Sequence, residues 1–81
     1  MSQPKITMYT RPGCPDVGRA AYFLRQRGMI WDEVDITENE AARKQVIEWT
    51  GREVTPTVWI GDTMLTEPDG AEIDAALAKA V

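Results

Sequence analysis

The sequence has no histidine and only one cysteine, and these two shortages exclude several classes of functional site. Without histidine there is no Cys–His catalytic pair, and most metal sites built from protein ligands alone are excluded. One cysteine cannot form a disulfide within the chain, which excludes the disulfide-rich scaffold of many small secreted domains. We therefore expect a protein of the reducing cytoplasm, with no protein-only metal site.

Long apolar runs and clusters of basic residues are also missing. A membrane span requires roughly 18 consecutive apolar residues, and the N-terminal residues lack the apolar core of a signal peptide. The net charge is −4 and no basic cluster is present, which argues against nucleic acid as a partner. We expect one monomeric domain spanning the 81 residues, with no membrane and no nucleic-acid partner.

The lone cysteine lies in residues 10–17, between a short apolar run and an amphipathic helical pattern. Cys14 therefore stands where a strand turns into a helix. The first backbone N–H groups of a helix have no internal partner, so they stabilise a nearby thiolate, which is the nucleophilic form of cysteine. Asp16, in the first turn, would repel that thiolate. A lone cysteine can equally be a small buried hydrophobe, and the residues by themselves leave both interpretations open.

The rest of the chain alternates between strand and helix patterns. Apolar and β-branched runs predict strands at residues 6–9, 30–36, 57–60 and 63–65. Amphipathic spacing predicts a helix from Pro15 to a cap at Gly28, a second from a Thr37 N-cap to about Thr50, and a third from an Asp69 N-cap to Ala80.

This order, β-α-β-α-β-β-α, predicts an α/β fold. A helix separates the first two strands, so we expect them to be parallel, and Gly61 with Asp62 predicts a hairpin between the last two. The result is a four-stranded mixed sheet with helices on both faces. In the second strand we expect Ile30 to lie on the buried face, and Glu33 and Asp35 to lie on the solvated face.

Three segments, at residues 9–15, 33–36 and 55–62, together resemble the glutaredoxins of the thioredoxin superfamily. The tail at residues 65–69 is similar to that of the actinobacterial mycoredoxins. The resemblance implies a thioredoxin-like fold and a thiol–disulfide oxidoreductase that serves cell redox homeostasis. It also implies a low-molecular-weight thiol as co-substrate (glutathione, mycothiol or bacillithiol), no tightly bound cofactor, and thiolated or disulfide-bearing client proteins as partners.

The same resemblance implies roles for individual residues. Cys14 would be the attacking thiolate, and Arg11 would bind a carboxylate of the small thiol. Pro56 would follow a cis peptide bond beside the sulfur, leaving the Thr55 backbone to pair with an extended substrate. The complete predicted site contains Cys14, Arg11, Pro15, Asp16, Thr55, Pro56 and Asp69.

Two departures from the family pattern bear on the mechanism. Val17 stands where dithiol relatives carry a second cysteine, so the site reads Cys-Pro-Asp-Val and implies a monothiol cycle. A natural valine and a valine substituted for a resolving cysteine give the same sequence. Typical glutaredoxins carry a Gly-Gly pair before the last helix, and this chain has Thr66 and Glu67, which makes helix capping the simplest role for Asp69.

Two other functions stay open at this stage. A [2Fe–2S] cluster could be shared by two chains, each giving one cysteine, with two small thiols as the remaining ligands. The cluster-binding subclass typically reads Cys-Gly-Phe-Ser at the site. This sequence reads Cys-Pro-Asp-Val instead, and Pro15 disfavours cluster binding. Alternatively, the domain could be redox-inactive and use the groove only to bind an extended peptide.

Overall fold

The computed structural model of the protein describes residues 3–80. The element order is the predicted one, β-α-β-α-β-β-α. The elements are β1 (Ile6–Thr10), α1 (Pro15–Gln26), β2 (Asp32–Asp35), α2 (Glu40–Thr50), β3 (Thr57–Ile60), β4 (Thr63–Thr66) and α3 (Gly70–Lys79). Within the described residues, no helix combines the length and the apolar character needed to cross a bilayer.

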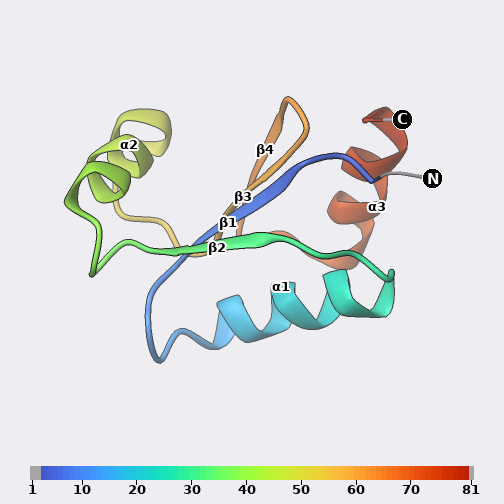
Figure 1. Ribbon diagram of the computed structural model, residues 1–81, viewed down its shortest axis with the longest axis horizontal. Coiled ribbons are helices and arrows are strands. Elements are labelled where there is room, and N and C mark those ends of the chain that lie inside the picture. Colours follow the sequence, from blue (N-terminus) through green and yellow to red (C-terminus); the bar gives the residue numbers. More distant parts are fainter. Residues whose placement is uncertain (1–2, 81) are drawn as a thin grey trace.

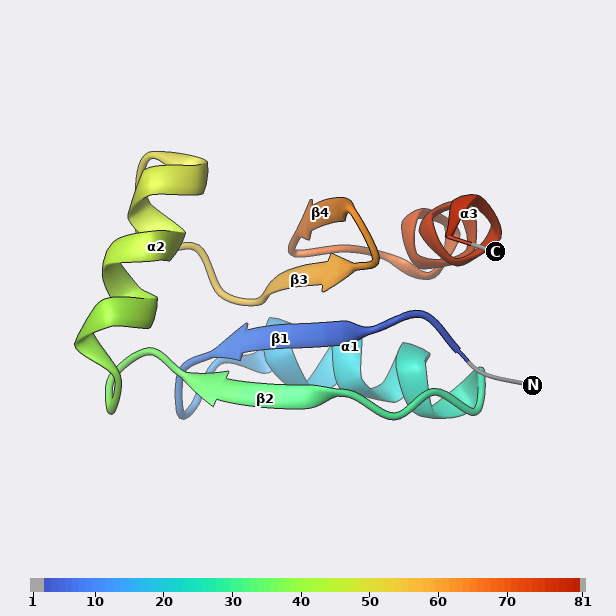
Figure 2. The same cartoon turned by 45° about the horizontal axis from the view of Figure 1, so that its top comes forward.

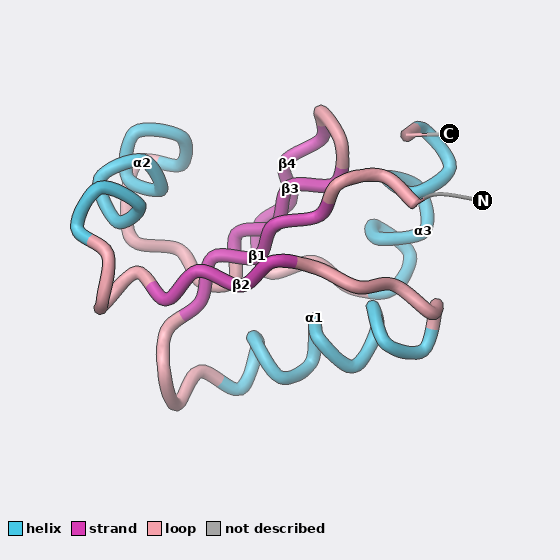
Figure 3. The backbone as a smooth tube through the Cα atoms, viewed as in Figure 1, coloured by secondary structure: helices cyan, strands magenta, loops and turns pink. Residues whose placement is uncertain are grey.

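The four strands form one mixed sheet in the order β2-β1-β3-β4 (Figure 1). β1 is parallel to β2, whereas β3 is antiparallel to both β1 and β4. In Figure 2 the arrowheads of β1 and β2 therefore point toward α2, and that of β3 points toward α3. The loop after β1 descends from this end of the sheet to the start of α1 (Figure 3), so the N-terminus of α1 lies near the carboxyl ends of the parallel strands.

Each face of the sheet is covered by helix, which confirms the predicted layering. On one face, Met8 and Val58 pack with Leu24 of α1 and Ile73 of α3, and all four side chains are fully buried. On the other face, Ile36 packs with Ala42 and Val46 of α2, beside the ring of Tyr9. Alternate residues of β1 thus serve opposite cores, as the period of a strand requires.

The second strand is shorter than predicted, and the expectation for Ile30 was wrong. β2 begins at Asp32, and Ile30 is 76% exposed. The Gln3 side chain accepts a hydrogen bond from the Ile30 N–H at 2.9 Å and donates one to the Ile30 carbonyl at 2.6 Å. Because a side chain already satisfies these backbone groups, residue 30 needs no neighbouring strand.

The predicted N-cap of α2 was also wrong, because Asn39 and not Thr37 caps this helix. The Asn39 side chain accepts a hydrogen bond from the Ala42 N–H at 3.0 Å. Thr37 is held instead by the Asp35 carboxylate, which accepts from its N–H at 2.8 Å and from its hydroxyl at 2.6 Å. The predicted N-cap of α3 is confirmed, since Asp69 and Glu72 form a reciprocal capping box.

The observed cap predicts that two similar substitutions differ in effect. Asn39→Ala leaves the Ala42 N–H without its partner and should lower the free energy of unfolding by about 1 kcal/mol. Thr37→Ala removes only an exposed hydroxyl contact and should change it by less than about 0.5 kcal/mol. Urea unfolding of both variants measures this difference. A larger loss for Thr37→Ala than for Asn39→Ala would contradict the assignment.

Candidate active site

Cys14 is the N-cap residue of α1, and this residue is partly exposed. The preceding loop turns at Gly13, whose φ of 76° lies in the left-handed region that glycine adopts without strain. The Cys14 backbone is extended, and its carbonyl accepts the first hydrogen bond of the helix, from the Val17 N–H at 3.1 Å. The interpretation of Cys14 as a sealed core residue is therefore wrong.

A second segment reaches the sulfur from the start of β3. The peptide bond between Thr55 and Pro56 is cis, as the resemblance implied. The Cys14 thiol donates to the Thr55 carbonyl at 3.5 Å, and the Thr55 hydroxyl lies 3.6 Å from the same sulfur. Thr55 is only 4% exposed, and Pro56 is buried. The sulfur therefore lies between a helix N-terminus and a fixed turn.

These surroundings lower the pKa of Cys14 below the ordinary value of a cysteine thiol. The largest cause is the Thr55 hydroxyl, which donates a hydrogen bond to the sulfur, and the N–H groups of Val17 and Asp16 act in the same direction. Burial of the sulfur and the negative charge of Asp16 oppose the shift. Arg11 is not among the causes of this shift in the pKa of Cys14.

An open groove of about 670 Å³ runs along one side of Cys14. It is lined by Thr10, Arg11, Pro12, Gly13, Cys14, Pro15, Val17, Glu33 and Asp35. Glu33 and Asp35, which we expected only as a solvated strand face, thus line the same groove as Cys14. The predicted parallel pairing of the first two strands could have indicated this position, because the carboxyl ends of adjacent parallel strands meet at one edge of the sheet. Asp35 is the register partner of Thr10 at that edge.

The structure does not bring every predicted residue into this groove. Thr55 and Pro56 are not among the lining residues. Asp16 is paired with Arg19 at 3.3 Å. The Asp69 carboxylate accepts the Glu72 N–H at 2.8 Å as part of the capping box, so its geometry is that of a helix cap.

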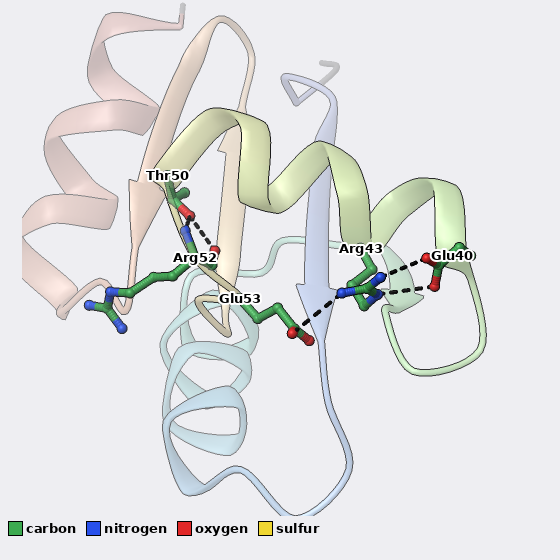
Figure 4. A network of polar contacts seen from close by, with 5 residues as sticks. All are labelled: Glu40, Arg43, Thr50, Arg52 and Glu53. Carbon is green, nitrogen blue, oxygen red and sulfur yellow. Dashed lines mark hydrogen bonds and ion pairs between the residues drawn. The ribbon is translucent and has the colours of Figure 1, made fainter.

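Polar contacts tie α2 to the loop that leads to Thr55 (Figure 4). Arg43 lies 2.6 Å from a Glu40 carboxylate oxygen and 3.5 Å from one of Glu53. The Thr50 hydroxyl donates to the Arg52 carbonyl at 2.6 Å, whereas the Arg52 side chain points away from Arg43 and Glu53. Since exposed ion pairs contribute little, these contacts guide the path of the loop more than they stabilise the fold.

Comparison with known proteins identifies the family of this site. Residues 6–65 match the model of the glutaredoxin family. The chain belongs to the glutaredoxin family. It is 33% identical over 55 residues to glutaredoxin 3 of Escherichia coli strain K12, an alignment that covers 68% of this chain and 66% of that protein.

Two further relatives show the same likeness. The chain is 31% identical over 70 residues to the hybrid peroxiredoxin hyPrx5 of Haemophilus influenzae, covering 86% of this chain but 29% of that protein. The solution structure of glutaredoxin from Brucella melitensis has a TM-score of 0.74 at 29% identity, covering 93% of this chain and 83% of that one. The chain thus spans less than a third of one curated relative and about two thirds of the other.

The Thr55 hydroxyl predicts a measurable effect on this glutaredoxin-family thiol. Thr55→Val keeps the shape of the side chain but removes the donor to the sulfur, so the pKa of Cys14 should rise. In the opposite direction, Asp16→Asn removes a repelling charge and should lower it further. Titration of the thiolate by its ultraviolet absorbance measures both shifts.

Thr57→Val is the matched control for this titration. Its hydroxyl donates to the Val54 carbonyl at 2.8 Å and makes no contact with the sulfur. This variant should lose stability but keep the pKa of Cys14. An unchanged pKa in Thr55→Val would contradict the assignment of the largest cause.

The lowered pKa also makes the stability of the fold depend on pH. Between the folded pKa and the unfolded value of about 8.5, the unfolded state binds more protons, so stability rises with pH. The contribution is complete above the unfolded value and is lost as pH falls through the folded pKa. Urea unfolding of the reduced wild type and of Cys14→Ser should be measured at several pH values. The free energy of unfolding of the wild type should increase relative to that of Cys14→Ser as the pH rises. A free energy of unfolding of the wild type that decreases relative to that of Cys14→Ser would contradict the lowered pKa.

Proposed function

We propose that the protein is a thiol–disulfide oxidoreductase that works through the single thiol of Cys14. The observation that carries this proposal is the position of Cys14. This partly exposed residue places its sulfur between the first turn of α1 and the Thr55 hydroxyl, and its pKa is lowered. A thiolate is the attacking species in disulfide exchange, and the optimum pKa of the attacking thiol lies near the ambient pH. The hydrogen-bond donors around Cys14 lower its pKa, and the Asp16 carboxylate limits the shift, which suits this requirement.

The proposed substrate is a mixed disulfide between a client protein and a low-molecular-weight thiol. The Cys14 thiolate attacks the sulfur of the small thiol, a new S–S bond forms to Cys14, and the client leaves as a thiolate that takes a proton from water. A second small thiol, as its thiolate, then attacks the same small-thiol sulfur. It releases Cys14 as a thiolate and forms the symmetrical disulfide. The net result is that the client sulfur is reduced and one free small thiol is oxidised, since the other small thiol was already part of the mixed disulfide. Val17 offers no second sulfur, so the cycle is monothiol.

The other residues of the proposed site position the small thiol. Thr55 takes part in no backbone–backbone hydrogen bond within residues 3–80, which supports pairing of its backbone with an extended guest. Arg11 supplies a positive charge in the groove beside Cys14. Pro15 and Asp16 form the first turn next to the sulfur, and Pro56 fixes the direction of Thr55. Asp69 contributes indirectly, because it caps the first turn of α3.

The small thiol in this proposal is glutathione, mycothiol or bacillithiol, and the setting is a reducing compartment such as the cytoplasm, in which a monomer meets its clients. No contact favours the [2Fe–2S] alternative. Pro15 has no N–H, so the first turn offers one donor fewer to a cluster sulfur. A redox-inactive peptide-binding domain has no need of a lowered thiol pKa.

Mass spectrometry of the reduced protein tests the proposal. Incubation with the oxidised forms of glutathione, mycothiol and bacillithiol, each separately, should add the mass of one small thiol to Cys14 in at least one case. The reduced form of the same thiol should then remove it, and Cys14→Ser should show no adduct. If none of the three disulfides modifies Cys14 near neutral pH, the protein is not an oxidoreductase of this kind.

A further inference from the structure

Glu67 has an unusual backbone conformation next to the candidate site. It follows the last residue of β4, and its φ of 46° lies in the left-handed region that non-glycine residues rarely adopt. Its N–H donates to the Pro56 carbonyl at 2.9 Å. Glu67 therefore lies directly beside the cis proline, Pro56. Pro56 in turn follows Thr55, the residue that contacts the sulfur.

The Glu67 side chain does nothing for the fold that would explain this strain. It is exposed, and within residues 3–80 it forms no hydrogen bond and no ion pair. Glycine would adopt the same φ without strain. A strained residue that persists without packing suggests a local functional role. The feature that glutamate adds here is an unpaired carboxylate at the edge of the cis-proline turn.

The groups near Glu67 offer few free donors to a carboxylate of a bound small thiol. At the start of α3, the Asp69 N–H donates to Glu72 at 3.0 Å and the Glu72 N–H donates to Asp69 at 2.8 Å. Two N–H groups of the first turn are thus taken by the chain's own carboxylates. In the groove that Cys14 lines, Arg11 lies with the carboxylates of Glu33 and Asp35.

We propose that Glu67 determines which small thiol reacts with Cys14, favouring an arm that carries hydroxyl or amine donors and disfavouring an arm that ends in a carboxylate. The inference rests on the proposed function, because it concerns the guest that lies along Thr55 and Pro56. A hydroxyl or ammonium group donates a hydrogen bond to the Glu67 carboxylate, whereas a second carboxylate is repelled by its like charge. Glu67 acts on binding of the arm and takes no part in the exchange of sulfur.

Three synthetic thiols of equal length test this proposal. Cysteine amide is acylated on nitrogen with a four-carbon chain ending in ammonium (4-aminobutyryl), hydroxyl (4-hydroxybutyryl) or carboxylate (succinyl). Each is presented as a mixed disulfide with the same cysteine-containing peptide. Cys14 thiolate attacks the probe sulfur and forms the probe disulfide, and the peptide leaves as a thiolate. Mass spectrometry follows the rate of probe addition at low ionic strength.

The wild type should react with the ammonium and hydroxyl probes roughly threefold to tenfold faster than with the carboxylate probe. Glu67→Gln should bring the three rates together, and Glu67→Lys should reverse the order. Added salt should shrink the difference between the ammonium and carboxylate probes. Asp62→Asn is the matched control, since it removes one exposed negative charge at the opposite end of β3 and should keep the wild-type order.

The outcomes separate this inference from the proposed function. Addition of all three probes to the wild type at equal rates would overturn the role of Glu67 while leaving the chemistry of Cys14 in place. An order that survives in Glu67→Gln overturns it as well. Addition of none of the probes overturns the proposed function itself.

Discussion

The contact between the Cys14 sulfur and Thr55, 41 residues later in the chain, is the interaction on which the candidate site depends. It exists because β1 and β3 are neighbours at the centre of the sheet. Their antiparallel register pairs Tyr9 with Thr57, so the end of β1 and the start of β3 lie side by side. The loop that follows β1 carries the cysteine, and the turn that precedes β3 carries the threonine. The sheet order therefore brings together two loops that the sequence keeps far apart.

Much of the fold could be predicted from the sequence, because it depends on local patterns. The alternation of strand and helix periods predicted all seven elements in order. Gly51 ends α2 with a φ of 89°, and Asp69 with Glu72 caps α3, both as their local sequences indicate. The cis bond before Pro56 is different, since only the family resemblance implied it. Nothing in the dipeptide itself distinguishes it from a trans bond.

The expectations that failed were decided by side-chain hydrogen bonds that the strand and helix periods do not show, one from a distant segment and one from a residue two positions away. Ile30 has a strand-like sequence, but the Gln3 side chain bonds both of its backbone groups. Thr37 has the residue type and spacing of an N-cap, but the Asp35 carboxylate holds it first.

The same limit applies to the site. The first-turn N–H groups near Cys14 could be predicted from the helix alone. The stronger donor, the Thr55 hydroxyl, could not, because it reaches the sulfur only through the pairing of β1 with β3.

The identity of the groups that lower the pKa of Cys14 links its reactivity to its choice of partner. The groups responsible are a neutral hydroxyl and backbone N–H groups, and no cation is among them. A cation next to the sulfur would lower the pKa too, but it would also attract every anionic thiol or client that approached. Neutral donors stabilise the thiolate only at hydrogen-bond distance. Farther out, the field is set by the guanidinium of Arg11 and the carboxylates of Glu33, Asp35 and Glu67. The short-range donors can thus govern how readily the sulfur attacks, while the surrounding charges govern what reaches it.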